Sequence, residues 1–107
     1  MRLLVADDHN LVRDALIGLL RLAEPEIELF SACDLPTALR EMREKKPIDL
    51  VLLDLRMPGM NGLGGLRQVI AAHPDVKIIL MSGAASSIDI QSAFEIGISG
   101  FIPKTMN

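Results

Sequence analysis

The chain has 107 residues, half of them hydrophobic, and a formal net charge of −3. This length fits one domain with its own core, and the mild acidity argues against a segment that grips nucleic acid by itself. Cys33 is the only cysteine, which excludes an internal disulfide, and we expect its side chain to be a small buried hydrophobe. No apolar run approaches the ~20 residues that span a bilayer, and no signal peptide is visible. We therefore expect a cytoplasmic protein without membrane contact.

The first third of the chain predicts a strand, a helix and a second strand. Residues 3–6 are apolar and precede a polar group of helix-capping types, after which a helical pattern runs to about residue 22. We expect the packed face of this helix to contain Val12, Leu16, Leu19 and Ala23. In the stretch 27–30 glutamate accompanies apolar residues, which is typical of an edge strand.

The middle of the chain predicts a helix, a buried strand and another helix. Asp34 is the expected N-cap of the first of these helices, with Pro36 in its first turn. Residues 50–53 form an unbroken apolar run that ends in Asp54 and a Pro/Gly loop, which indicates a strand buried on both faces. Gly62 is expected to start the following helix.

The last third predicts a strand over 76–81, a loop of small residues, a helix over about 86–96 and a short strand at 101–102. Strands that alternate with helices imply parallel pairing and right-handed crossovers. The polar second strand suits a sheet edge. We therefore predict a doubly wound, five-stranded parallel α/β sheet in the order 2-1-3-4-5, a flavodoxin-like fold. It would form one domain over 1–107 that lacks the final helix.

Polar side chains follow four of the predicted strands. Asp7 and Asp8 follow the first, Asp54 the third, Ser82 the fourth and Lys104 the fifth. Because parallel strands end at one edge of the sheet, these groups should converge, and three carboxylates repel one another unless a cation joins them. Oxygen ligands with room for water suit Mg²⁺, and a lysine and a hydroxyl suit phosphoryl oxygens. One carboxylate can then act as a nucleophile and form an aspartyl-phosphate. Taken singly, these residues would be a helix cap, a turn serine and a surface lysine.

At these residues the chain resembles, over its full length, the receiver (CheY-like) domain of two-component response regulators. The resemblance lies in the acid pair, in Asp54 with the Met-Pro and Gly62 that follow, in Ser82, and in Phe101 with Lys104 beyond it. The segments 7–13 and 54–60 look most like the LuxR-type subgroup, whose members carry a helix-turn-helix output domain. The resemblance implies a sensor histidine kinase as partner, and DNA binding only through a C-terminal output domain that is absent here.

The resemblance also implies roles for individual residues. Asp54 matches the phosphoacceptor, Asp8 the direct Mg²⁺ ligand, Asp7 the acid that acts through water, and Arg56 the residue whose backbone carbonyl binds the metal. Among the remaining positions, Lys104 matches the lysine that pairs with the phosphoryl group, Ser82 the switch hydroxyl, Gly83 a backbone donor to a phosphoryl oxygen, Phe101 the aromatic that turns inward when the hydroxyl moves, and Arg56 and Ala84 the positions that tune the phosphoryl lifetime.

The sequence departs from the family pattern at two positions, and the helix that the family has after Lys104 is missing. Asn61 stands where members commonly have aspartate, and Thr105 follows Lys104 where many have proline. A cis bond after Lys104 would therefore lack proline's help, at a cost of roughly 3 kcal/mol.

The resemblance implies a regulatory module that is not a turnover enzyme. Two alternatives stay open: a phosphatase of the haloacid dehalogenase type, which would need an acid where Arg56 stands, and a receiver that never takes phosphate and serves as an interaction surface. In the predicted fold the first helix and the missing fifth helix share one face of the sheet, and the other three helices cover the opposite face. We therefore expect an open apolar face, and with it self-association or reduced stability.

Overall fold

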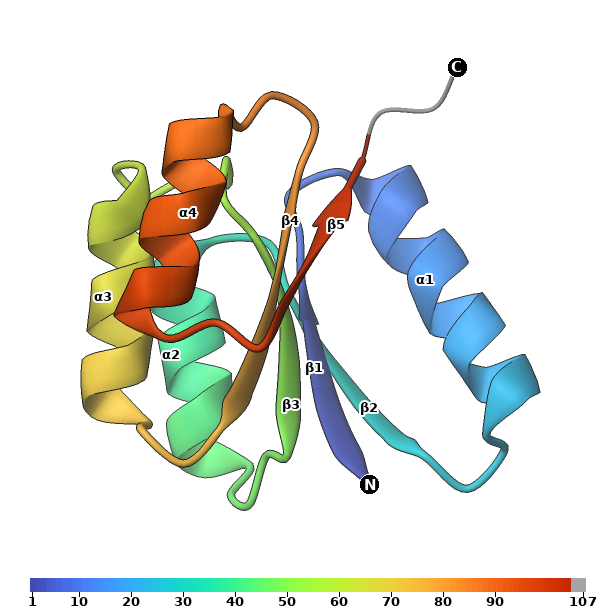
Figure 1. Cartoon of the computed structure of the whole chain (residues 1–107). Helices are drawn as coiled ribbons and strands as arrows, with labels where there is room; N and C mark the ends of the chain where they lie inside the picture. The colour runs from blue at the N-terminus through green and yellow to red at the C-terminus, as the bar shows by residue number, and fades with distance from the viewer. Residues whose placement is uncertain (105–107) are drawn as a thin grey trace.

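The computed structural model describes residues 1–104, which form five strands and four helices in strict alternation (Figure 1). The elements are β1 (Arg2–Ala6), α1 (Asn10–Ala23), β2 (Glu28–Ala32), α2 (Leu35–Glu44), β3 (Leu50–Asp54), α3 (Leu63–Ala72), β4 (Lys77–Ser82), α4 (Ser87–Ile96) and β5 (Gly100–Pro103). All neighbouring strands pair in parallel, in the order β2-β1-β3-β4-β5. The predicted fold and strand order are confirmed, and within residues 1–104 no helix follows β5.

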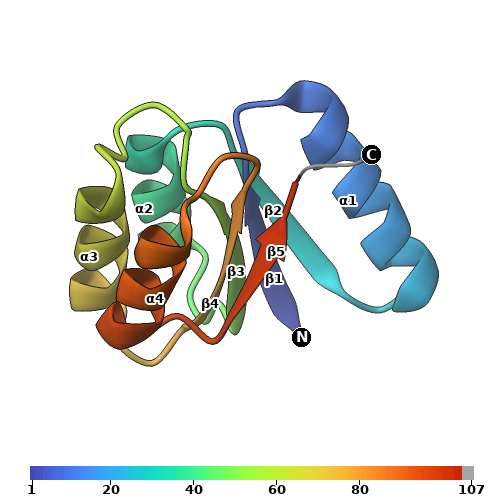
Figure 2. The same ribbon diagram turned by 45° about the horizontal axis from the view of Figure 1, so that its top comes forward.

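The sheet has one well-covered face and one thinly covered face. Helices α2, α3 and α4 lie together on one side, and α1 lies alone on the other, as both views show (Figures 1 and 2). Side chains alternate between the two faces along each strand. The face under α2, α3 and α4 includes Leu4, Val51, Leu53, Ile78 and Leu80, all fully buried, and the face toward α1 includes Leu3, Val5, Leu52 and Met81.

Local signals place α2 where the sequence predicts it. The Asp34 carboxylate accepts a hydrogen bond from the Thr37 N–H at 2.8 Å, and Pro36 lies in the first turn. The cap satisfies one of the free N–H groups at the start of the helix, and proline lacks an N–H that would need a partner there. Leu35, Ala38 and Met42 then form the buried stripe that packs on the sheet.

The packed face of α1 differs from the prediction. Leu16, Ile17 and Leu20 contact the sheet, whereas Leu19 is 64% exposed and Ala23 is also exposed. The helix carries leucines on several sides, and Leu11 and Leu22 are also exposed. Periodicity alone therefore could not decide which side turns toward the sheet.

Cys33 is exposed, so the expectation of a buried side chain was wrong. It directly follows the edge strand β2, whose last residue, Ala32, is buried. Cys33 lies outside the strand, in the bend between the edge strand β2 and the cap of α2, so the sheet does not bury its side chain. The bond after Lys104, which the sequence left open as cis or trans, lies outside the described residues.

No helix in the described part is long and apolar enough to cross a membrane.

Candidate functional site at the carboxyl edge of the sheet

The carboxyl edge of the sheet brings the predicted acids together. Asp7 directly follows β1 and Asp54 is the last residue of β3, and both side chains are buried, at 0% and 1% exposure. Asp8 and His9 come next along the chain and are exposed. Ligand atoms from these four residues all lie within 4.8 Å of one another. The convergence expected from parallel strand ends is therefore present.

Lys104 connects the two buried carboxylates. Its Nζ lies 3.0 Å from Asp7 Oδ2 and 3.2 Å from Asp54 Oδ2, and its side chain is only 15% exposed. The backbone N–H of Lys104 donates to the Ser82 carbonyl at 2.9 Å, which continues the β4–β5 pairing past Pro103. The pairing of β4 with β5 thus fixes the backbone position from which the Lys104 side chain reaches the two carboxylates.

Backbone N–H groups orient both buried acids. The Arg56 N–H donates to Asp54 Oδ1 at 3.0 Å, and the His9 N–H donates to Asp7 Oδ1 at 2.8 Å. Each donor lies two residues after its acceptor, so each loop turns sharply where its strand ends. These bonds leave the Oδ2 atoms of both acids directed toward Lys104.

The buried acids differ in pKa. Burial raises the pKa of Asp54, and the nearby Asp7 charge raises it further. The hydrogen bond from the Arg56 backbone N–H and the contact with Lys104 lower the pKa, but by less. Burial also acts to raise the pKa of Asp7, but hydrogen bonds from His9 and the contact with Lys104 bring it below the usual value. The pKa of Lys104 is raised because its two carboxylate partners outweigh its desolvation. Two buried carboxyl groups thus share one ammonium group.

Of the two residues assigned to switching, Ser82 is fully buried and Phe101 is partly buried. Ser82 is buried, and its Oγ accepts a hydrogen bond from the Ala84 N–H at 3.2 Å. Phe101 pairs with Leu80 and is partly buried against the core on the face that α2, α3 and α4 cover. A cavity of about 350 Å³ opens above the cluster, lined by Asp8, His9, Asp54, Arg56, Gly83, Ala84 and Lys104.

His9 is the member of the site that sequence reasoning missed. Its Nδ1 lies 3.0 Å from Lys104 Nζ, 3.1 Å from Asp7 Oδ1 and 3.2 Å from Asp8 Oδ1. The residue occupies the N-cap position of α1, but its side chain makes no capping hydrogen bond. Its place directly after two strand-end acids was the available signal.

The cluster fits a divalent cation such as Mg²⁺. Asp7 Oδ2 is buried and accepts no hydrogen bond of good geometry, although Lys104 lies nearby. With Asp8 the cluster holds three carboxyl groups against one lysine, and carboxylate oxygens are the ligands that hard divalent cations prefer. Asp7, Asp8 and Asp54 are the side chains that could hold the ion.

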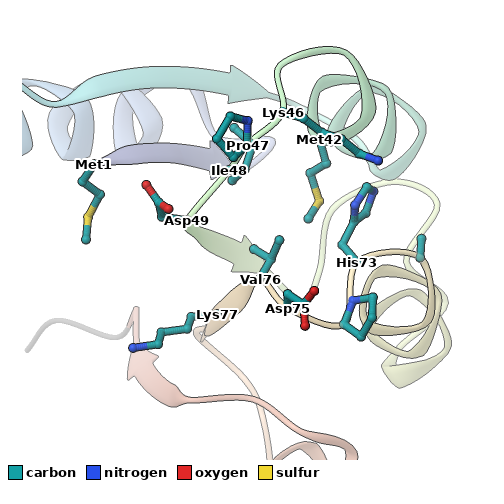
Figure 3. Close-up of a pocket in the computed structure, with 12 residues that line it drawn as sticks. Met1, Met42, Lys46, Pro47, Ile48, Asp49, His73, Asp75, Val76 and Lys77 are labelled. Carbon is teal, nitrogen blue, oxygen red and sulfur yellow. The ribbon is translucent and has the colours of Figure 1, made fainter.

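A larger cavity, of about 770 Å³, lies at the opposite, amino edge of the sheet (Figure 3). Its lining mixes the apolar Met42, Ile48 and Val76 with side chains of both charges. Within residues 1–104 the only group of three or more metal-ligating side chains is the one at the carboxyl edge. Size therefore does not identify the functional site here, whereas the gathered acids do.

Comparison with known proteins agrees with this geometry. Residues 3–107 match the family model described as response regulator receiver domain. The chain belongs to this family. The receiver domain is also 36% identical over 104 residues to the glycerol metabolism activator of Pseudomonas putida, covering 97% of this chain and 47% of the relative. It is 33% identical over 107 residues to the transcriptional regulatory protein LnrK of Bacillus subtilis, covering 100% of this chain and 48% of that protein.

A solved structure supports the same assignment. The receiver domain superposes on a LuxR family DNA-binding response regulator from Silicibacter pomeroyi with a TM-score of 0.84 and 30% identity, covering 100% of this chain and 81% of that chain. The chain spans about half the length of the curated relatives it matches. Membership of the family argues against the haloacid dehalogenase alternative.

Proposed function

We propose that this receiver domain accepts a phosphoryl group on Asp54 and works as a regulatory switch, not as a turnover enzyme. The observation that carries the proposal is the placement of Asp54: a buried carboxylate that contacts Lys104 and lies among Asp7, Asp8 and His9. The cavity above it admits a phosphodonor from solvent.

The chemistry follows from these groups. A carboxylate oxygen of Asp54 attacks phosphorus of a phosphohistidine or an acyl phosphate, the bond between phosphorus and the leaving nitrogen or oxygen breaks, and an aspartyl-phosphate forms. The leaving group departs with the bonding electron pair. Lys104 stands 3.2 Å from Asp54 Oδ2, close enough for its ammonium to pair with a transferred phosphoryl oxygen.

Mg²⁺ would be held by the Asp7, Asp8 and Asp54 carboxylates and the Arg56 backbone carbonyl. When bound, it neutralises charge that develops on the phosphoryl oxygens. In this proposal the raised pKa of Asp54 reflects burial and the Asp7 charge. A cation beside both acids would offset the Asp7 charge and so lower the pKa of Asp54.

The same proposal assigns the signal to the β4–β5 side of the domain. Ser82 and the Gly83 N–H contact the new phosphoryl oxygens, Phe101 turns inward as Ser82 moves, and Arg56 and Ala84 set how long the phosphoryl group survives. A sensor histidine kinase supplies the group in the cytoplasm. The response regulators among the relatives support an output in transcription, through a DNA-binding domain outside these 107 residues.

The test is incubation with acetyl phosphate and Mg²⁺, followed by intact mass measurement. We expect one added phosphoryl group that hydroxylamine and base remove, and no addition in Asp54→Asn. Asp75→Asn, an exposed aspartate on the loop before β4, is the matched control and should be labelled like the original chain. Equal labelling of Asp54→Asn would refute the assignment of the nucleophile.

Two other outcomes identify the alternatives. A chain that binds Mg²⁺ but takes no phosphoryl group from either donor would be a receiver that serves only as an interaction surface. Steady release of phosphate from a phosphomonoester, abolished by Asp54→Ala, would show a turnover phosphatase.

A further inference from the structure

The imidazole of His9 is directed into the acid cluster and is not used for helix capping. The His9 backbone is extended, with φ −89° and ψ 107°, and its N–H already donates to Asp7 Oδ1. Its Nδ1 lies within 3.2 Å of one oxygen each of Asp7 and Asp8, and 3.8 Å from Asp54 Oδ2. One nitrogen atom therefore faces all three carboxylates.

These separations are within hydrogen-bond range of Asp7 Oδ1 when Nδ1 carries a proton, and they also match those of ligands that share one ion. Two ligand atoms at about 2.1 Å from a metal lie about 3.0 Å apart when they are at right angles and about 4.2 Å apart when they are opposite. The 3.1 Å and 3.2 Å distances of Nδ1 match the right-angle case, and the 3.8 Å distance to Asp54 falls between the two limits. An ion can thus contact His9 and the carboxylates after small side-chain movements.

The contact with Lys104 shows how the nitrogen can be used. An ammonium group can only donate, so the 3.0 Å contact between Lys104 Nζ and His9 Nδ1 is a hydrogen bond when Nδ1 presents its lone pair. A lone pair beside two carboxylate oxygens needs a cation between them, and Lys104 supplies one positive charge. Asp7 Oδ2, the other oxygen of the carboxylate that His9 contacts, is buried and accepts no well-formed hydrogen bond, so Asp7 has capacity left for a cation.

We propose that His9 Nδ1 is a metal ligand that makes this pocket prefer a divalent transition ion, such as Co²⁺ or Zn²⁺, over Mg²⁺. The proposal rests on the magnesium site described above and extends it. Carboxylates and water suit Mg²⁺, whereas imidazole suits transition ions, whose affinities for mixed nitrogen and oxygen sites rise along the first row. Because the ion would contact Asp54, the nucleophile, transition ions would compete with Mg²⁺ at the phosphoacceptor itself.

The test compares metal affinities of the untagged 107-residue chain by calorimetry, with Co²⁺, Zn²⁺ and Mg²⁺ in separate titrations. All variants carry Cys33→Ser, because the exposed thiol would otherwise bind the transition ions. We expect His9→Ala to weaken Co²⁺ and Zn²⁺ at least about tenfold while Mg²⁺ changes less than about twofold. His9→Asn, which can place an amide oxygen near the Nδ1 position, should likewise favour Mg²⁺. His73→Ala removes the other histidine of the chain and should change none of the affinities.

A second readout identifies the atom. Imidazole nitrogen NMR with diamagnetic Zn²⁺ should move the Nδ1 resonance of His9 to the metal-bound range and leave a proton on Nε2, with His73 unchanged. An unchanged affinity ratio between Co²⁺ and Mg²⁺ in His9→Ala, or an equal loss for both ions, would overturn the role of His9 while the magnesium site stands. A chain that binds neither Mg²⁺ nor Co²⁺ would overturn both proposals.

Discussion

At the scale of single residues, the site is organised by an excess of negative charge that Lys104 only partly offsets. The raised pKa of Asp54 and the lowered pKa of Asp7 arise in neighbouring buried groups that share this one lysine. Burial and the Asp7 charge raise the pKa of Asp54, so an added cation would favour its charged form. A metal should therefore stabilise the folded chain as well as assist phosphoryl transfer.

Mg²⁺ is predicted to raise the melting temperature, and Asp8→Ala should abolish most of that rise. Binding at one hundred times the dissociation constant adds about 2.7 kcal/mol to the free energy of unfolding. Asp7→Ala should reduce the effect somewhat less, because the carboxylates of Asp8 and Asp54 remain. Calorimetric melts with and without Mg²⁺ measure both. An equal Mg²⁺ shift in the original chain and in Asp8→Ala would contradict the site.

Ser82→Ala is predicted to keep phosphorylation but to uncouple it from Phe101. The Ser82 Oγ is buried and accepts from Ala84, and a phosphoryl group on Asp54 offers it a new oxygen to bind. Without the hydroxyl, nothing draws the β4 end inward to vacate space for the ring. Chemical shifts around Phe101 before and after phosphorylation measure the coupling, with Ser31→Ala on the edge strand β2 as control. Shift changes that persist undiminished in Ser82→Ala would count against it.

At the scale of elements, α3 shows how two adjacent glycines can serve different purposes. A Cβ built on Gly65 would lie 2.6–2.7 Å from the Met60 sulfur and backbone, closer than real atoms approach, whereas the nearest atom to one on Gly64 is 3.9 Å away. Gly65 is buried against the loop that follows Asp54, and Gly64 faces solvent. The close packing of Gly65 therefore helps to hold the loop that follows Asp54, the proposed phosphoacceptor.

Gly65→Ala is predicted to destabilise the fold, and Gly64→Ala to stabilise it slightly. The added methyl group at 65 must push the Met60 backbone away, at about 1–3 kcal/mol. At 64 alanine gains helix propensity and restricts the unfolded chain, worth about 0.4–1 kcal/mol. Urea unfolding of the two variants gives both values. Equal free energies of unfolding for Gly65→Ala and the original chain would show that the Met60 loop moves aside without loss of stability.

Sequence reasoning succeeded at this scale wherever a local rule left one choice. Asp34 and Pro36 mark the start of α2, and the end of an apolar run places Asp54 at the sheet edge. It failed where tertiary packing chose among equivalent local options. Leucines on several sides of α1 did not reveal that Leu19 faces outward, and a capping-type residue did not reveal that the His9 ring turns toward the acids.

At the scale of the whole molecule, the two faces of the sheet differ in cover. No residue of α1 is fully buried, and Leu50 and Ile79 on the same face of the sheet are only partly buried. Ile102 of β5 pairs with Met81 and so faces the α1 side, where it is 44% exposed. Ile102 therefore leaves apolar surface open on this side, as expected of an uncovered face, and Leu19, which we expected to pack, is exposed as well. Phe101 belongs instead to the opposite, covered face.

The 107-residue chain is predicted to self-associate through this α1 side, because contiguous exposed apolar surface is unusual on a monomer. Light scattering coupled to size exclusion should show a mass that rises with concentration, and Leu19→Lys should reduce it. Ile88→Lys is the matched control, since Ile88 is 76% exposed but lies on α4, across the sheet. Burial of apolar surface between copies adds stability only at high concentration, so the melting temperature should rise with protein concentration as well. A monomer at every concentration that is also as stable as a chain extended past Asn107 would refute the prediction, because it would mean that the open face costs nothing in water.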